Sequence, residues 1–159
     1  MLQVMLSNFK ENKQVGDVFL IATMNGDEIN HMTFEIGDIP KNLIRPAIVD
    51  LIDNFKPDAF IVIMTHNMVL RQSSEIEAMK KEFDEVGSVD KMKDCKEVIV
   101  FTYETGLVSN VSIYEVIRTD NDAVLNESTL MSAMDIEQDV FFTGILNRGR
   151  HHKLLQILN

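Results

Sequence analysis

Hydrophobic residues recur along the chain with a helical spacing in three places. The spacing i, i+3, i+4, i+7 near the N-terminus predicts a short helix over residues 2–12. A wider apolar stripe in "KNLIRPAIVDLIDNF" predicts a longer helix over residues 41–55, and a last helix is expected over residues 136–158. The positions of the middle stripe are Leu43, Ile44, Ala47, Ile48, Leu51, Ile52 and Phe55.

Alternating or continuous apolar runs predict the strands. Asn25-Gly26 separates the run 18–24 from the alternating run 31–36, and both turn residues tolerate the positive φ of a type I′ hairpin. The run 59–64 is apolar on both faces, which indicates a central strand. A second hairpin is expected around Glu104-Thr105-Gly106. It pairs residues 98–103 with residues 108–117, and residues 123–131 read either as a further strand or as a helix.

Residues 70–95 interrupt this pattern with an inserted helix and loop. The sequence "SEIE" at Ser74–Glu77 has the form of a capping box, which predicts a helix with a narrow apolar stripe at Ile76, Met79 and Phe83. The polar stretch that follows contains Gly87 and predicts an exposed loop. Because so few apolar anchors hold this insertion, we expect it to be the most mobile part of the chain and, if a partner binds, part of its contact surface; a docked surface helix without such a role explains it as well.

These elements predict an α+β domain, one unit over residues 1–159. The expected order is α-β-β-α-β-(α/loop)-β-β-(β)-α, with one mainly antiparallel sheet of five to six strands and helices packed against it. This element order resembles the roadblock and longin-type (profilin-like) domains in topology only, and that resemblance implies pairing of two copies. The stretches "KPDAFIVI", "EVIVFTYETG" and "SIYEVIR" are similar to a group of small uncharacterised bacterial and phage proteins, a resemblance that implies no activity.

Composition and charge narrow the functional classes. The net charge of −10 disfavours global nucleic-acid binding, which works by replacing condensed counterions with Lys and Arg. The single cysteine, Cys95, cannot form an internal disulfide and fits a reducing compartment, so a cytoplasmic location is expected. No window approaches the ~18 apolar residues that a membrane span requires, so no membrane association is expected.

Two groups of residues are candidates for a functional site. Thr65, His66 and Asn67 end the central strand, where a small hydrolase or nuclease could place reactive groups, although a strand surfacing into a loop explains them as well. A basic cluster near the C-terminus could bind a phosphate or an acidic partner, or form the polar face of the last helix. Its members are Arg148, Arg150, His151, His152 and Lys153.

Other chemistry finds little support in the residues. His31-Met32-Thr33 resembles the H-x-T motif of two-histidine phosphoesterases, but that chemistry needs a second copy of the motif and the chain has none. One cysteine and four scattered histidines predict no metal site, and the absence of phosphate-binding glycine motifs predicts no cofactor.

The sequence therefore predicts a non-enzymatic binding domain for a protein partner or for self-association. The terminal helices 2–12 and 136–158 are the expected surfaces for self-association. The alternative is a hydrolase or nuclease with its site at Thr65, His66 and Asn67.

Overall fold

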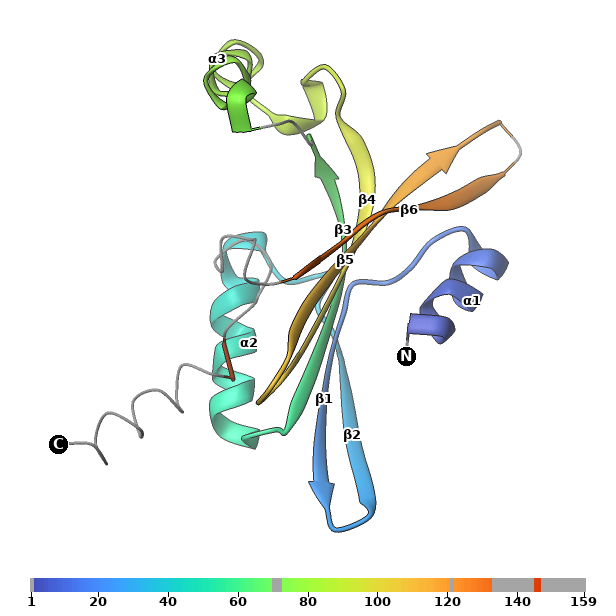
Figure 1. Ribbon diagram of the computed structural model, residues 1–159, viewed down its shortest axis with the longest axis vertical. Coiled ribbons are helices and arrows are strands. Elements are labelled where there is room, and N and C mark those ends of the chain that lie inside the picture. The colour runs from blue at the N-terminus through green and yellow to red at the C-terminus, as the bar shows by residue number, and fades with distance from the viewer. Residues whose placement is uncertain (1, 70–72, 121, 133–144, 147–159) are drawn as a thin grey trace, which may run out of the picture.

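The computed structural model describes residues 2–69, 73–120, 122–132 and 145–146 (Figure 1). The helices are α1 (Leu2–Asn12), α2 (Lys41–Phe55) and α3 (Ile76–Val86), with 3₁₀ turns η1 (Ser73–Glu75) and η2 (Val89–Lys91). The strands are β1 (Val18–Asn25), β2 (Glu28–Glu35), β3 (Ala59–Met68), β4 (Lys96–Thr105), β5 (Ser109–Arg118) and β6 (Ala123–Ser132).

This order confirms the predicted α+β class. The segment that could be either strand or helix is the strand β6. The predicted last helix, 136–158, and the basic cluster 148–153 lie outside the described residues, except that Ile145 and Leu146 of the helix are described.

The strands form one antiparallel sheet in the order β2-β1-β3-β4-β5-β6. β2 and β3 both run opposite to β1, so the chain must cross over β1 between them, and α2 makes that crossing. The β1–β2 hairpin is confirmed, but its two turn residues are Gly26 and Asp27, because Asn25 lies opposite Glu28. Gly26 has a φ of 62°, whereas neither Asn25 nor Asp27 has a positive φ, so the type I′ turn expected at Asn25-Gly26 is wrong. Among the described strands, β1 and β3 are therefore the only hydrogen-bonded neighbours that do not follow one another along the chain.

Two aspartates extend the pairing of β1 with β3 at both ends. The ladder itself runs from Val18 opposite Ile63 to Ala22 opposite Ala59. Just beyond its ends, Asp17 Oδ1 accepts the Thr65 N–H at 2.7 Å and Asp58 Oδ2 accepts the Met24 N–H at 2.7 Å. Each carboxylate satisfies a backbone donor that has left the ladder, which explains an acid at the start of each strand.

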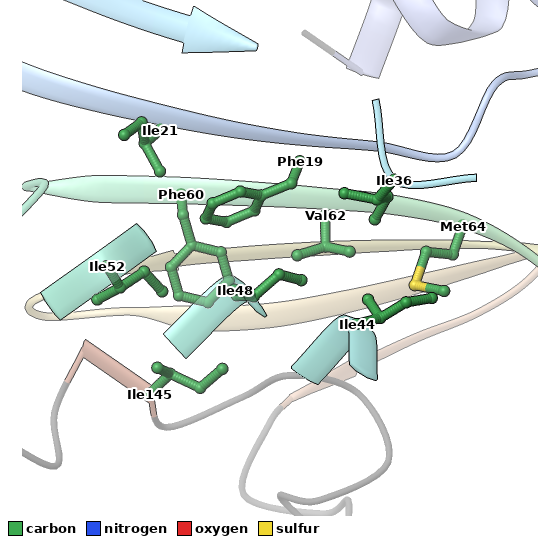
Figure 2. Packing of buried hydrophobic residues seen from close by; sticks show 10 residues of the cluster. All are labelled: Phe19, Ile21, Ile36, Ile44, Ile48, Ile52, Phe60, Val62, Met64 and Ile145. Atoms are coloured by element: carbon green, nitrogen blue, oxygen red, sulfur yellow. The ribbon is translucent and has the colours of Figure 1, made fainter. Parts of the chain in front are cut away.

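One face of the sheet packs against α2 (Figures 1 and 2). Phe60 of β3 is fully buried and its ring lies 5.9 Å from that of Phe19 of β1. The buried side chains of α2 come from one stripe, as the sequence predicts, and they close over these rings. The cluster comprises Phe19, Ile21, Ile36, Ile44, Ile48, Ile52, Phe60, Val62, Met64 and Ile145.

The opposite face of the sheet packs against α1 (Figure 1). Met5 and Phe9 of α1 are each 2% exposed and pack with Ile99, Tyr114 and Val116 of β4 and β5. The apolar face of α1 is therefore covered by the chain's own sheet. Val4 of the same helix is 55% exposed, and self-association through this helix stays a prediction.

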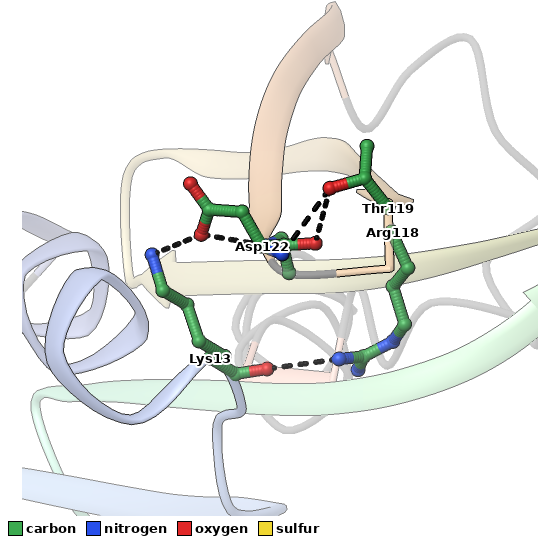
Figure 3. Close-up of polar contacts among 5 residues, drawn as sticks. Lys13, Arg118, Thr119 and Asp122 are labelled. Atoms are coloured by element: carbon green, nitrogen blue, oxygen red, sulfur yellow. Dashed lines mark hydrogen bonds and ion pairs between the residues drawn. The ribbon is translucent and has the colours of Figure 1, made fainter.

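Polar contacts fix the end of α1 to the turn between β5 and β6 (Figure 3). Lys13 Nζ lies 2.6 Å from an Asp122 carboxylate oxygen, and Arg118 donates a hydrogen bond to the Lys13 carbonyl at 3.1 Å. The Arg118 guanidinium also donates to both carboxylate oxygens of Glu97, at 2.7 and 2.6 Å. These exposed contacts orient α1, although such surface pairs each contribute only about 0–1 kcal/mol.

A buried carboxylate holds the segment at residues 145–146. Glu104 is fully buried, and its two carboxylate oxygens accept the N–H groups of Ile145 and Leu146 at 3.2 and 3.0 Å. The prediction that Glu104 belongs to a turn is wrong, because β4 continues through Thr105. The carboxylate is tolerated inside the domain because it is hydrogen-bonded there.

Candidate functional site

The described part of the inserted region, residues 73–95, lies beyond the main body of the sheet (Figure 1). β3 pairs with β4 as far as Met68, whereas its pairing with β1 stops at Ile63. β4 pairs with β5 from Val98 onward, so only the last two pairs of β3 with β4, Asn67 with Glu97 and Met68 with Lys96, form a short two-stranded extension, and α3 lies at its end. Elements at such a position have few neighbours to pack against.

α3 confirms the expected helix, but it begins at Ile76 rather than at a serine cap. A 3₁₀ turn precedes it, and no side-chain cap bond is made at its N-cap residue Glu75. None of its residues is buried, and both Ile76 and Phe83 remain more than 40% exposed. An amphipathic helix whose apolar stripe stays this open gains little stability from its own domain.

A groove of about 340 Å³ runs between α3 and the sheet extension. Its lining is mainly apolar, with Lys80 and Asp84 as its charged members. Met92 forms part of it and is 6% exposed, so the prediction of an exposed loop after α3 is wrong at this residue. We call this feature the α3 groove; it is lined by Asn67, Met68, Val69, Met79, Lys80, Phe83, Asp84, Val89 and Met92.

Thr65, His66 and Asn67 do not converge on one site. Successive side chains of a strand point to opposite faces of the sheet. Thr65 lines a hollow of about 210 Å³ on the α1 side, together with Phe9 and Arg118. His66 lies on the other face, close enough to Lys41 of α2 to feel its charge. The strand itself therefore separates the threonine from the histidine.

Burial lowers the pKa of His66 below its ordinary value of 6.5, and the nearby Lys41 lowers it further, while the charge of Asp17 acts in the opposite direction. No hydrogen bond joins His66 to Asp17 within the described residues, and the carboxylate of Asp17 is engaged by the Thr65 N–H. A neutral histidine without an orienting partner is poorly placed to act as a general base.

The lowered pKa of His66 makes stability depend on pH. The unfolded chain binds this proton more readily than the folded chain. The neutral form of His66 therefore contributes its full share of the free energy of unfolding above pH 6.5, and this contribution is lost as the pH falls below that value. We expect the melting temperature to fall between about pH 7.5 and about pH 5.5, and to fall less in His66→Gln.

Thermal melts of the two proteins at both pH values test this expectation. His31→Gln is the matched control because His31 is an exposed strand residue, and it should keep the pH dependence of the wild type. An equal fall in the wild type and in His66→Gln would contradict the assignment.

The described residues offer little support for a metal site, a reactive cysteine or a membrane span. Within the described part of the chain, no group of three or more His, Cys, Asp or Glu side chains could hold a metal ion. Cys95 is a free thiol of intermediate exposure. No helix in the described ranges is both long and apolar enough to cross a membrane.

Several residues of these sites were not identified from the sequence. Met68 and Val69 of the α3 groove follow the candidate triplet directly but have no chemical signature of their own. The burial of Glu104 could have been predicted from the sequence. Alternate residues of a strand lie on one face of the sheet, so Glu104 shares a face with Val98, Val100 and Thr102, and all four are buried.

Comparison of the chain with protein-family models, with curated proteins and with solved structures finds no match.

Proposed function

We propose that the chain is a non-enzymatic protein-interaction domain whose contact surface is the α3 groove. The observation that carries the proposal is the open apolar stripe of α3, which faces a methionine-lined groove instead of a filled core. Methionine side chains are flexible and polarizable, so such a surface adapts to an apolar partner. A cytoplasmic location is part of this proposal, and the free Cys95 supports it.

The chemistry of α3 favours a partner segment with an apolar core and basic flanks. The helix sequence IEAMKKEFDEV carries four acidic residues and two lysines, a difference of two negative charges. Complementary charge around an apolar contact speeds encounter and selects the partner. An amphipathic helix or a short strand that inserts one or two apolar side chains is the occupant that fits this groove.

Replacing Phe83 by serine is expected to abolish partner binding while the domain stays folded. The side chain is 43% exposed, so only part of its surface is buried, and we expect a destabilisation of about 1–2 kcal/mol. Urea denaturation measures the stability.

Binding is tested by a photo-crosslinking amino acid placed at Phe83 in the native host, with the same probe at the exposed Glu85 as the control. A single adduct formed at position 83 and absent at position 85 supports the proposal. Equal labelling at both positions, or none at position 83, contradicts it.

A further inference from the structure

β2 forms one edge of the sheet and is open along its length. The sheet order places it outermost, with β1 as its partner on the inner side (Figure 1). All of its residues except Phe34 are exposed. Ile29 is 66% exposed and Met32 is 41% exposed, so apolar side chains accompany the open edge.

The register of β1 shows which backbone groups of β2 point outward. The Ala22 carbonyl accepts the Asp58 N–H at 2.9 Å, and the Met24 N–H binds the Asp58 side chain. Both residues therefore direct their backbone groups towards β3, away from β2. In an antiparallel ladder their cross-strand partners, His31 and Ile29, must likewise point away from β1.

The same alternation extends along the rest of the strand. Thr33 and Glu35 point outward with His31 and Ile29, while Asn30, Met32 and Phe34 bond to β1. Four consecutive odd-numbered positions thus present N–H and C=O groups on the open edge.

Within the described residues, this edge lacks most features that prevent strand pairing, and its only charged residues, Glu28 and Glu35, stand at its two ends. Its sequence, EINHMTFE, contains neither proline nor lysine, and its pairing with β1 has no register shift. The other edge strand, β6, differs, because its register against β5 shifts between Ile113 and Tyr114. A bulge of this kind twists an edge strand and discourages further pairing.

We propose that β2 pairs with β2 of a second copy in antiparallel orientation, around a two-fold axis at Met32, so that one sheet runs through both copies. This register places Ile29 opposite Glu35 of the second copy and His31 opposite Thr33. Each of the four outward positions of one copy then lies opposite an outward position of the second copy. Each such pair exchanges two backbone hydrogen bonds, which gives about eight across the interface.

The charges on the strand favour the register with its axis at Met32 over the register with its axis at His31. With the axis at Met32, no two like charges lie opposite each other along the strand. With the axis at His31, Asp27 lies opposite Glu35 of the second copy, and only three outward positions are paired. Like charges placed directly opposite destabilise a strand pair, so the Met32 register is favoured.

Symmetry favours a second copy over an open chain of molecules. A strand that pairs with itself about a two-fold axis closes after two copies. Pairing of β2 with β6 of the next molecule would continue without end, and the register shift in β6 disfavours it. Closing the β2 edge also shields the exposed Ile29 and Met32 from water.

Proline at position 31 tests the pairing. The His31 N–H points outward and makes no bond to β1, so His31→Pro removes donors from the proposed interface and none from the β1–β2 ladder. His31→Ala is the matched control, because it removes the side chain and keeps the N–H. We expect the wild type and His31→Ala to sediment as dimers and the dimer dissociation constant of His31→Pro to rise about tenfold or more.

A cysteine at the axis provides a second test that does not depend on a proline variant folding. In a Cys95→Ser background, Met32→Cys should form a covalent dimer under a mild oxidant, because non-hydrogen-bonded partners lie about 4.5 Å apart at Cα. Asn30→Cys is the control on the same face. In this register, position 30 of one copy lies four residues along the strand from position 30 of the second copy, so this variant should not cross-link.

Each outcome decides the proposal. A wild type that stays monomeric at about 100 µM, a folded His31→Pro that dimerises as the wild type does, or cross-linking at position 30 as fast as at position 32 would overturn it. The inference rests on the sheet edge and not on the α3 groove, so Phe83→Ser should leave the dimer intact.

Discussion

Replacing Phe60 by alanine is expected to lower the free energy of unfolding by about 3–5 kcal/mol. The ring is fully buried in the central strand β3, where it packs between Phe19 and the stripe of α2. Alanine leaves a cavity between two layers that are held apart by their backbones, so the space cannot close completely. Since a domain of this kind has about 5–15 kcal/mol of stability, the variant should remain folded but with a much reduced margin.

Urea denaturation of the wild type, Phe60→Ala and Phe55→Ala measures this effect. Phe55 is the matched control, because it belongs to α2 and is 43% exposed, so the same truncation removes much less buried surface. A loss at Phe60 no larger than the loss at Phe55 would show that the layer between α2 and the sheet does not form as described.

Replacing Glu104 by alanine is expected to cost about 2–4 kcal/mol and to release the segment at residues 145–146 from the sheet. The carboxylate accepts the N–H groups of Ile145 and Leu146, and each donor that loses its partner away from water costs about 1–3 kcal/mol. Glu104→Gln keeps one acceptor oxygen and the shape of the side chain, so it should cost less than the alanine variant.

Hydrogen exchange at the amides of Ile145 and Leu146, combined with urea denaturation, tests this expectation. Glu97→Gln is the control, because Glu97 lies on the same strand and pairs with Arg118 at the surface, where such a pair contributes about 0–1 kcal/mol. If Glu104→Ala leaves both amides as protected as they are in Glu97→Gln, the buried carboxylate does not hold the segment.

Local patterns in the sequence were sufficient to predict most of the elements. Asn25-Gly26 predicted its hairpin because glycine adopts the positive φ that a tight turn requires, although the turn itself is formed by Gly26 and Asp27. The stripe over residues 41–55 specifies its helix in the same way. The position of β3 beside β1 could not be predicted, because that pairing joins residues about 40 positions apart and depends on where α2 packs.

The candidate site was predicted less well, for identifiable physical reasons. Thr65 and His66 are neighbours in sequence, yet strand alternation sends them to opposite faces, which the period of two already implied. Met92 lies among polar residues and gives no periodic signal, although it is a buried residue of the insertion. The partner-facing role assigned to residues 70–95 stays a prediction, which the open stripe of α3 makes testable.

The order of strands in the sheet also bears on how fast the protein folds. Three of the five neighbouring pairs, β1–β2, β4–β5 and β5–β6, close short turns, whereas β3 joins β4 through the insertion and β1 joins β3 across α2. Domains with mainly local contacts fold faster than those that depend on distant ones. The slow steps should therefore be the two long closures, that of β3 on β4 and that of the β1–β2 hairpin on β3. In the second, α2 closes over β1 and the carboxylates of Asp17 and Asp58 engage the two ends of the new ladder.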